Sequence, residues 1–196
     1  MDKKFRITFN APVTLSFTMI CFIVTLLGML FGRKFTELLF MTYHSSFQDP
    51  LTYVRFITHI FGHDNWSHFI SNASYLLLLG PMLEEKYGPK KIIQIMLIVA
   101  LVTGGINYIF LPNSAIFGAS GVVFSFILLA SFTNFQEGEL PLTVILVAAI
   151  FMGQQIYEGI FIKNEISNMA HIVGGIIGAV TGYFLNKKSR IGKIDQ

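Results

Sequence analysis

Six stretches of the chain combine an apolar composition with enough length to cross a lipid bilayer. A transmembrane helix needs about 20 mostly apolar residues to span the hydrocarbon core. The pattern predicts such helices over residues 11–32, 66–83, 92–111, 117–133, 140–157 and 167–185. The second, fourth and sixth runs are close to the minimum length, so we expect each to have an end drawn into the protein or into a water-filled cavity.

The composition favours a membrane protein over a soluble one. Hydrophobic residues make up 53% of the 196 residues and charged residues 13%, and the mean hydropathy is +0.62. A soluble domain with a polar exterior is less apolar than this. We therefore expect an all-α integral membrane protein, a bundle of six transmembrane helices in which residues 1–196 form a single membrane domain with no separate soluble domain.

Basic residues lie unevenly at the ends of the apolar runs. Six crossings return the chain to its starting side, and that side holds ten basic residues: Lys3, Lys4, Arg6, Lys86, Lys90, Lys91, Lys187, Lys188, Arg190 and Lys193. The other side holds only Arg33, Lys34, Arg55 and Lys163. Because Lys and Arg accumulate on the cytoplasmic side of membrane proteins, both termini are predicted to be cytoplasmic. The net charge of +3 follows from these flanks, so no nucleic-acid partner is expected.

Residues 33–65 form the one long connection between the predicted helices, on the side opposite the termini. The segment carries few charges and many aromatic residues, namely Phe35, Phe40, Tyr43, Phe47, Tyr53 and Phe56. Aromatic rings gather at the level of the lipid headgroups. The segment is therefore predicted either to sit partly in the membrane interface or to be an ordinary structured outer loop.

A run of small residues, Gly118-Ala119-Ser120-Gly121, stands at the start of the fourth apolar run. Small residues commonly let transmembrane helices approach one another closely, so this motif taken alone indicates packing. A hydroxyl at the end of a membrane helix can also be a nucleophile, provided that a base lies within hydrogen-bond reach.

His68 and His171 are the only Asp, Glu, Lys, Arg or His residues inside the predicted spans. Ionisable groups at membrane depth are costly and usually functional. The second, fourth and sixth helices enter from the same side, and His68, Ser120 and His171 each lie within about five residues of a helix start, or about 8 Å of rise. The three side chains are therefore predicted to share one depth.

Two further patterns suit a catalytic arrangement of these groups. His68 and Asn72 are spaced i, i+4, which stacks them on one helix face as two donors that suit an oxyanion hole. Gly174 and Gly178 follow His171 and form a small-residue stripe. If the stripe packs against the fourth helix at Gly121 and Ser125, the imidazole reaches the Ser120 hydroxyl.

With these motifs the chain resembles a rhomboid intramembrane serine protease of the minimal six-helix bacterial form, over nearly its whole length. The two spaced histidines and the asparagine of that family's second helix are matched by His63, His68 and Asn72. Its serine motif is matched by Gly118-Ala119-Ser120-Gly121. The Ala-His with following glycines on its sixth helix is matched by Ala170, His171, Gly174 and Gly178.

The resemblance implies an enzyme that cleaves membrane proteins in or near their transmembrane segments, without cofactor or metal. Ser120 would be the nucleophile and His171 the general base and later acid, with the Ser120 amide, His68 and Asn72 as the oxyanion hole. Gly118, Gly121, Phe124, Gly174 and Gly178 would support the site. A substrate helix would enter from the lipid near the second and fifth helices, under a mobile loop at about 158–167. The site would open to the extracytoplasmic side of the cell membrane, in a monomer or weak oligomer.

The chain departs from the family pattern at two positions. Phe124 stands where the family often has a tyrosine that stacks on the catalytic histidine, so a ring is present without its hydroxyl. Val54-Arg55 stands where the outer loop commonly carries Trp-Arg. No carboxylate lies in a span to hold the tautomer of His171, so a Ser–His dyad with slow turnover is expected.

Several other polar residues receive structural interpretations. His59 and His63 are expected to make hydrogen bonds within the protein, because no carboxylate or cysteine completes a four-ligand metal set beside them. Glu84 and Glu85 with Lys86 are interpreted as an interfacial charge cluster. Gln154 and Gln155 are predicted either to hydrogen-bond across the bundle or to line a water path to the serine.

Two other function classes remain open. One is a non-catalytic relative that binds or escorts membrane proteins, although such proteins usually lack the serine or the histidine. The other is a channel or small-solute transporter, for which the usual intramembrane Asp, Glu, Lys or Arg is missing.

Overall fold

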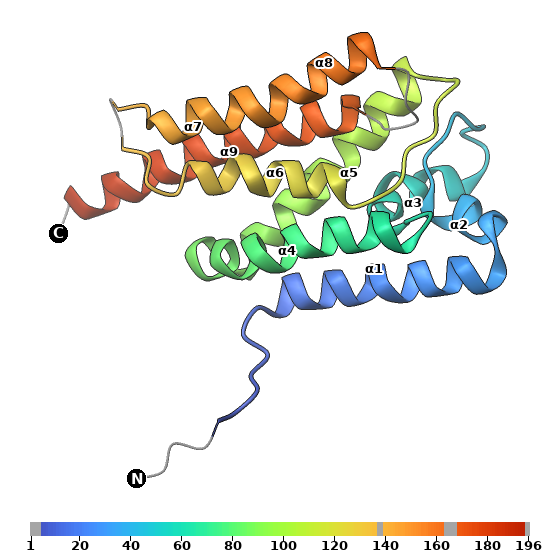
Figure 1. Ribbon diagram of the computed structural model, residues 1–196, viewed down its shortest axis with the longest axis horizontal. Coiled ribbons are helices and arrows are strands. Elements are labelled where there is room, and N and C mark those ends of the chain that lie inside the picture. The colour runs from blue at the N-terminus through green and yellow to red at the C-terminus, as the bar shows by residue number, and fades with distance from the viewer. Residues whose placement is uncertain (1–4, 137–138, 163–167, 195–196) are drawn as a thin grey trace.

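Every named element among the described residues is a helix (Figure 1). The computed structural model describes residues 5–136, 139–162 and 168–194, with side chains as far as residue 187. The elements are α1 Pro12–Phe31, α2 Arg33–Phe40, α3 Pro50–Thr58, η1 His59–Phe61, α4 Trp66–Tyr87, α5 Pro89–Phe110, α6 Ser120–Ser131, α7 Leu142–Val147, η2 Ala148–Met152, α8 Gly153–Phe161 and α9 Asn168–Ile194.

Each of the six apolar runs coincides with a helix, but the predicted lengths are wrong in several places. α4 has 22 residues and α9 has 27, so neither is near the minimum length. α6 has only 12 residues and begins at Ser120 rather than at residue 117. α7, η2 and α8 follow one another without a break, and we call Leu142–Phe161 the α7–α8 rod. This rod ends four residues beyond the predicted end at residue 157.

Among the described residues, four helical segments are long and apolar enough to span a membrane by themselves: Pro12–Phe31, Pro89–Phe110, Leu142–Phe161 and Asn168–Lys187. α6 is apolar but too short, because 12 residues at 1.5 Å per residue rise only about 18 Å. Loop residues on either side must therefore complete any crossing at α6. The count of six spans remains a prediction.

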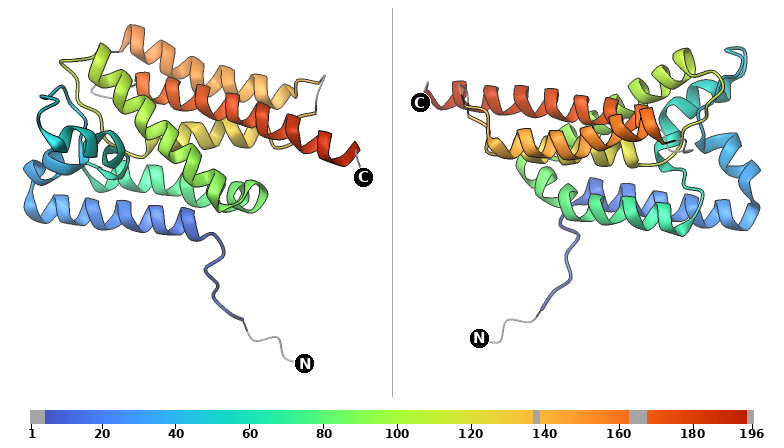
Figure 2. Two further views of the ribbon diagram at one scale, coloured as in Figure 1. Left: turned by 180° about the vertical axis from the view of Figure 1, so that it is seen from behind. Right: turned by 45° about the horizontal axis from the view of Figure 1, so that its top comes forward.

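The short helix α6 lies in the middle of the bundle. In Figure 1, α4 runs along one side of it and α9 along the other, and α5 crosses behind α6 and α9. Seen from behind, α5 lies on the near side of the two helices (Figure 2, left). Val122, Phe126 and Leu129 on α6 are fully buried. A central helix of this kind places its first residue, Ser120, within reach of side chains from several neighbours.

Glycines bring α6 and α9 into backbone contact. A side chain added at Gly174 would collide with the backbone of Gly121, and one added at Gly178 would collide with the backbone of Ser125. Since these obstacles are backbone atoms, they cannot turn aside as a flexible side chain could. The glycine stripe of α9 therefore packs on α6 at the positions that the sequence singles out.

Glu84 is a buried cap for α1 and not part of an interfacial charge cluster. Its carboxylate accepts hydrogen bonds from the backbone N–H groups of Val13 and Thr14, each at 2.9 Å, and from the Thr14 hydroxyl. The side chain is 5% exposed. A carboxylate at a helix N-terminus satisfies unpaired N–H groups and interacts favourably with the helix dipole. Glu84 thus ties α4 to the start of α1.

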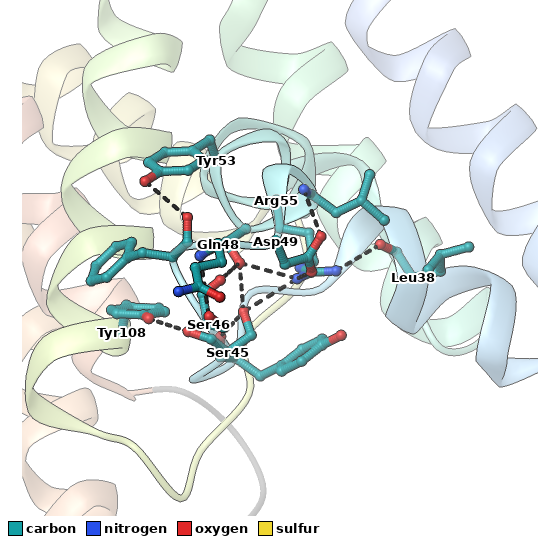
Figure 3. Close-up of polar contacts among 12 residues, drawn as sticks. Leu38, Ser45, Ser46, Gln48, Asp49, Tyr53, Arg55 and Tyr108 are labelled. Atoms are coloured by element: carbon teal, nitrogen blue, oxygen red, sulfur yellow. Dashed lines mark hydrogen bonds and ion pairs between the residues drawn. The ribbon is translucent and has the colours of Figure 1, made fainter.

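The connection over residues 33–65 is a structured element built around Arg55 (Figure 3). The Arg55 guanidinium donates hydrogen bonds to Asp49 Oδ2 at 2.6 Å, Ser45 Oγ at 3.2 Å and the Leu38 carbonyl at 3.1 Å. It also lies 4.6 Å from the centre of the Tyr43 ring. The hydrogen bond from Arg55 lowers the pKa of Asp49. Arg55 therefore holds α2, α3 and the turn between them together.

This structured segment also fixes the chain that leads into α6. Thr42 and Ile116 exchange two backbone hydrogen bonds of 2.9 Å, and the Thr42 hydroxyl donates to the Arg55 carbonyl at 2.7 Å. The Asn107 amide donates to the Ser114 carbonyl at 3.1 Å. The residues just before Ser120 are thus held from two sides, by the outer segment and by α5.

Candidate active site

A glycine turn delivers Ser120 to the start of α6. Gly118 has a φ of 118°, a conformation that residues with a side chain rarely adopt, and its N–H donates to the His59 carbonyl at 2.9 Å. A Cβ at Gly118 would also lie 2.9 Å from the His68 ring. The backbone N–H of Ser120 belongs to the first turn of α6, where N–H groups have no acceptor within the helix.

The Ser120 hydroxyl and the His171 imidazole are hydrogen-bonded. Ser120 Oγ lies 2.7 Å from His171 Nε2, although the two residues are 51 positions apart in the sequence. His171 is on the first turn of α9 and only 9% exposed. The close contact of α6 with α9 at Gly121 and Gly174 places the two side chains in this relation. A hydroxyl beside a buried imidazole is the arrangement that nucleophilic catalysis by serine requires.

Phe124 stacks on the His171 ring. The ring centres are 4.4 Å apart and the planes differ by 4°. Phe151 on the α7–α8 rod meets Phe124 edge-on, with centres 6.1 Å apart. Phe124 thus covers one face of the imidazole with an aromatic ring that carries no hydroxyl.

Gln155 makes a contact with His171 that the sequence left open. Its Oε1 lies 2.6 Å from His171 Nδ1, and its side chain is 5% exposed. The neighbouring Gln154 instead donates to Glu158 on the same rod, at 2.8 Å. In the sequence, the one indication of such a contact is that side-chain amides inside a membrane generally need hydrogen-bond partners. This preference applies equally to Gln154 and Gln155, so it could not identify Gln155 as the partner of His171.

His68 and Asn72 lie one turn apart on α4 and line the same cavity as Ser120. His68 Nδ1 is 3.1 Å from Asp64 Oδ1, and Asn65 caps the helix by accepting from the His68 backbone N–H. The Asn72 amide donates to His63 Nε2 at 3.1 Å and is 5% exposed. Asn72 is therefore held in one orientation by His63.

His63 is a hydrogen-bond acceptor for Asn72 because its ring is buried and neutral. His63 Nδ1 lies 3.2 Å from the Phe61 carbonyl, which places the ring proton on Nδ1 and leaves Nε2 free to accept. Burial, with a smaller contribution from nearby His68, lowers the pKa of His63 to about 3. His59 likewise bonds within the protein, to the Arg55 carbonyl and to the Thr103 hydroxyl. No group of three or more His, Cys, Asp or Glu side chains that could hold a metal occurs in the part of the chain that the structure describes.

A cavity of about 630 Å³ joins these groups. Its walls include most of the residues that the sequence singles out, together with Gln155: His68, Asn72, Gly118, Ser120, Gly121, Phe124 and His171. Gly174 and Gly178 do not line it and act instead at the contact of α9 with α6. The arrangement places a hydroxyl, an imidazole hydrogen-bonded to it and several other hydrogen-bonding side chains around one space.

The predicted mobile loop at about 158–167 is only partly described. Residues 158–161 form the last turn of α8, so the prediction is wrong for these positions. Residues 163–167 lie outside the described residues.

Comparison with known proteins gives one consistent result. A family model for the rhomboid domain matches residues 50–188. The rhomboid protease GlpG of Haemophilus influenzae is 26% identical over 193 residues, which cover 95% of this chain and 96% of that protein. Rhomboid-related protein 2 of Mus musculus is 29% identical, and rhomboid-like protein 11, chloroplastic, of Arabidopsis thaliana is 24% identical. The matches cover 69% and 68% of this chain, but only 52% of each of those two longer proteins.

Proposed function

This chain belongs to the rhomboid family of intramembrane serine proteases, and we propose that it hydrolyses its substrates with Ser120 as nucleophile and His171 as general base. The observation that carries the proposal is the 2.7 Å contact of Ser120 Oγ with His171 Nε2 at the wall of a cavity. A general base must lie within hydrogen-bond reach of the proton that it removes, and this pair meets that requirement.

The reaction proceeds in two halves. Ser120 Oγ attacks the scissile carbonyl as its proton passes to His171 Nε2, and the resulting tetrahedral intermediate collapses when His171 returns that proton to the leaving amine. The second half repeats these steps with water in place of the serine, which releases the acyl group. His171 thus carries the proton both when the bond from Ser120 Oγ to the carbonyl carbon forms and when the carbon–nitrogen bond of the substrate breaks.

Three donors serve as the oxyanion hole: the Ser120 backbone N–H, His68 and Asn72. The Ser120 N–H is supported in this role by its place in the first turn of α6, where the helix dipole also favours negative charge. Asn72 is supported by the His63 contact, which uses one of its two amide protons and leaves the second for the substrate. Loss of one such donor typically costs about 10²-fold or more in rate.

Substrates are membrane proteins cut in or near a transmembrane segment that enters the bundle from the lipid, near α4 and the α7–α8 rod. Support comes from the loose packing of the rod. Only 11% of the residues in its most apolar stretch are buried inside the protein, whereas 50% are buried in the corresponding stretch of α5. A helix with few buried contacts is the one that moves most readily to admit a chain. The Ser120–His171 pair then meets the substrate at the cavity wall.

The site opens to the extracytoplasmic side, and both termini lie in the cytoplasm. The basic residues at the ends of the helices support this orientation. α1 starts and α9 ends at one end of the bundle, whereas the starts of α6 and α9 and the outer segment lie toward the other end (Figure 1). We further propose that the enzyme works as a monomer or weak oligomer, because the side chains around Ser120 and His171 all come from one chain.

Reconstitution with a transmembrane reporter peptide in lipid vesicles tests the mechanism. Ser120→Ala and His171→Ala are each expected to lower cleavage by about 10³-fold or more, because both are needed in the same proton transfer. Ser125→Ala is the matched control, since it removes a buried hydroxyl from the same helix and should leave the rate within about twofold. Equal cleavage by the wild type and Ser120→Ala would refute the mechanism.

A further inference from the structure

We propose that Gln155 is a positioning residue for catalysis: its amide oxygen accepts the Nδ1 proton of His171 and holds the ring in the tautomer that can take the proton of Ser120. The proposal rests on the proposed function of the Ser120–His171 pair. It replaces the expectation of an unsupported dyad with a neutral third member on a separate helix.

The proposal starts from the two hydrogen bonds of the His171 ring. Nε2 faces the Ser120 hydroxyl at 2.7 Å, and Nδ1 faces Gln155 Oε1 at 2.6 Å. To accept the serine proton, Nε2 needs its lone pair, so the single proton of the neutral ring must be on Nδ1. That proton needs an acceptor, and an amide oxygen provides one. If the Gln155 amide were turned over, its NH₂ group would face the N–H at His171 Nδ1, and neither group could accept a hydrogen bond.

Burial makes this choice of tautomer strongly dependent on Gln155. Gln155 is 5% exposed and His171 is 9% exposed, so water competes poorly for Nδ1. Without an acceptor, the buried Nδ1–H would be unpaired, and the ring would gain by moving its proton to Nε2. A ring with its proton on Nε2 donates to Ser120 and cannot act as its base.

The uncharged amide suits the surroundings of this site. In soluble triads a carboxylate fills the same place, both orienting the imidazole and stabilising the imidazolium. A carboxylate at membrane depth is costly to bury. The amide keeps the orienting hydrogen bond and supplies only a dipole, which agrees with the slow turnover expected from the sequence.

Local geometry explains why Gln155 reaches the ring and Gln154 does not. The π-helical segment η2, Ala148–Met152, comes just before the glutamines and turns the rod more widely than an α-helix does. Gln155 then points to His171, whereas Gln154 bonds along the rod to Glu158. Phe151 on the same rod packs edge-on against Phe124, the ring stacked on His171. The α7–α8 rod therefore contacts the imidazole directly through Gln155 and supports it indirectly through Phe151, which packs against the stacked ring of Phe124.

The test compares Gln155→Leu, which removes the acceptor, with Gln155→Glu, which keeps one, and with Gln154→Leu as matched control. With the reporter peptide in vesicles, Gln155→Leu is expected to lower kcat by about 10- to 100-fold with KM within about twofold. Gln155→Glu should recover part of that loss, because it keeps an acceptor but must bury a carboxylate. Gln154→Leu should stay within about twofold of the wild type.

A second readout does not depend on activity. The ¹⁵N chemical shifts of His171 in protein labelled at histidine report which ring nitrogen carries the proton. The wild type and Gln154→Leu are expected to show Nδ1–H, and Gln155→Leu a shift toward Nε2–H. Thermal unfolding of each variant separates loss of folding from loss of positioning, and Gln155→Glu supplies the folded comparison if Gln155→Leu unfolds.

The outcomes separate this proposal from the proposed function. Unchanged kcat and unchanged ¹⁵N shifts in Gln155→Leu, together with complete loss of cleavage in Ser120→Ala, would overturn the role of Gln155 and leave the protease mechanism intact. Full cleavage by Ser120→Ala would overturn the mechanism, while the ¹⁵N shifts would still decide whether Gln155 sets the tautomer. A loss in Gln155→Leu that Gln155→Glu does not reduce at all would show that a hydrogen-bond acceptor at this position is not what His171 requires, and would also overturn the proposal.

Discussion

At the scale of residues, the imidazole of His171 is held on three sides by groups from two elements, α6 and the α7–α8 rod. Ser120 lies at Nε2, Gln155 lies at Nδ1, and Phe124 covers one face. Each contact restricts a different motion of the ring: the two hydrogen bonds restrict rotation within its plane, and the stacked ring restricts tilting. A buried side chain so restricted loses little further freedom on reaching the transition state.

Phe124→Leu tests the stacking contact. Replacing the ring should lower kcat by about 2- to 10-fold, because an aromatic pair is worth roughly 0.5–1.5 kcal/mol beyond its burial. Phe124→Tyr keeps the ring and should retain the rate of the wild type or exceed it. Cleavage of the reporter peptide measures both variants, and a Leu variant as fast as the wild type would contradict a role for the stacked face.

At the scale of elements, the site depends on how closely α9 approaches α6. The contact is backbone to backbone at Gly121 with Gly174 and again at Ser125 with Gly178. Ser120 adjoins Gly121 in this contact, and His171 lies three residues before Gly174. Any increase in the separation of the two helices therefore increases the distance between Ser120 Oγ and His171 Nε2.

Gly174→Ala is expected to weaken both folding and catalysis. Its methyl group would meet the Gly121 backbone, and forcing extra volume into a packed interface typically costs about 1–3 kcal/mol. The midpoint of unfolding should fall, and the rate of Ser120 labelling by a fluorophosphonate should fall by at least about tenfold, since a 1 Å displacement of a reacting group can cost as much as 10²-fold.

Gly105→Ala serves as the control for Gly174→Ala. Gly105 is also a helical glycine, but a Cβ there would meet no atom within 4 Å. The substitution should leave the labelling rate unchanged. If Gly174→Ala behaves like Gly105→Ala, close approach of α6 and α9 is not what sets the geometry of the site.

At the scale of the whole molecule, the outer segment and the bundle are joined through buried histidines near the site. His59 connects η1 to α5 through Thr103, and His63 connects the loop before α4 to Asn72. Burial lowers the pKa of His59 to about 4 and that of His63 to about 3, from an ordinary value near 6.5. Both histidines are therefore neutral in the folded protein under conditions in which the unfolded chain is already protonated.

Acid is expected to destabilise the folded protein through these two groups. Below a pH of about 6.5 the unfolded state binds more protons than the folded state, so the free energy of unfolding falls as the pH falls from about 6.5 toward 4. Above a pH of about 6.5 both histidines are neutral in the folded and the unfolded state, so their contribution to the free energy of unfolding no longer changes with pH. The unfolding midpoint measured across this range in the wild type and in His59→Gln checks the expectation, and the variant should show the shallower slope. Identical slopes in the two proteins would exclude His59 as a source of the acid sensitivity.

Some features follow from the sequence because they depend on one residue or one run at a time. The positions of the helices follow from runs of apolar residues, and His68 and His171 stand out because ionisable residues are rare within such runs. The role of Glu84 could not be recognised in this way, because its partners Val13 and Thr14 lie about 70 positions earlier in the chain. The lengths of α4, α6 and the α7–α8 rod were also missed, since polar caps and loop contacts end a helix as much as hydropathy does.

The sequence by itself determined that this is a helical membrane protein of the rhomboid family and which polar groups are candidates for chemistry, because transfer from water to lipid is a property of each side chain. Only the tertiary structure decided that Gln155, and not Gln154, meets the imidazole, and that Arg55 and Glu84 hold the outer segment and α1 in place. These hydrogen bonds depend on the relative rotation and separation of helices to within a fraction of an ångström. Side chains far apart in sequence set that geometry together.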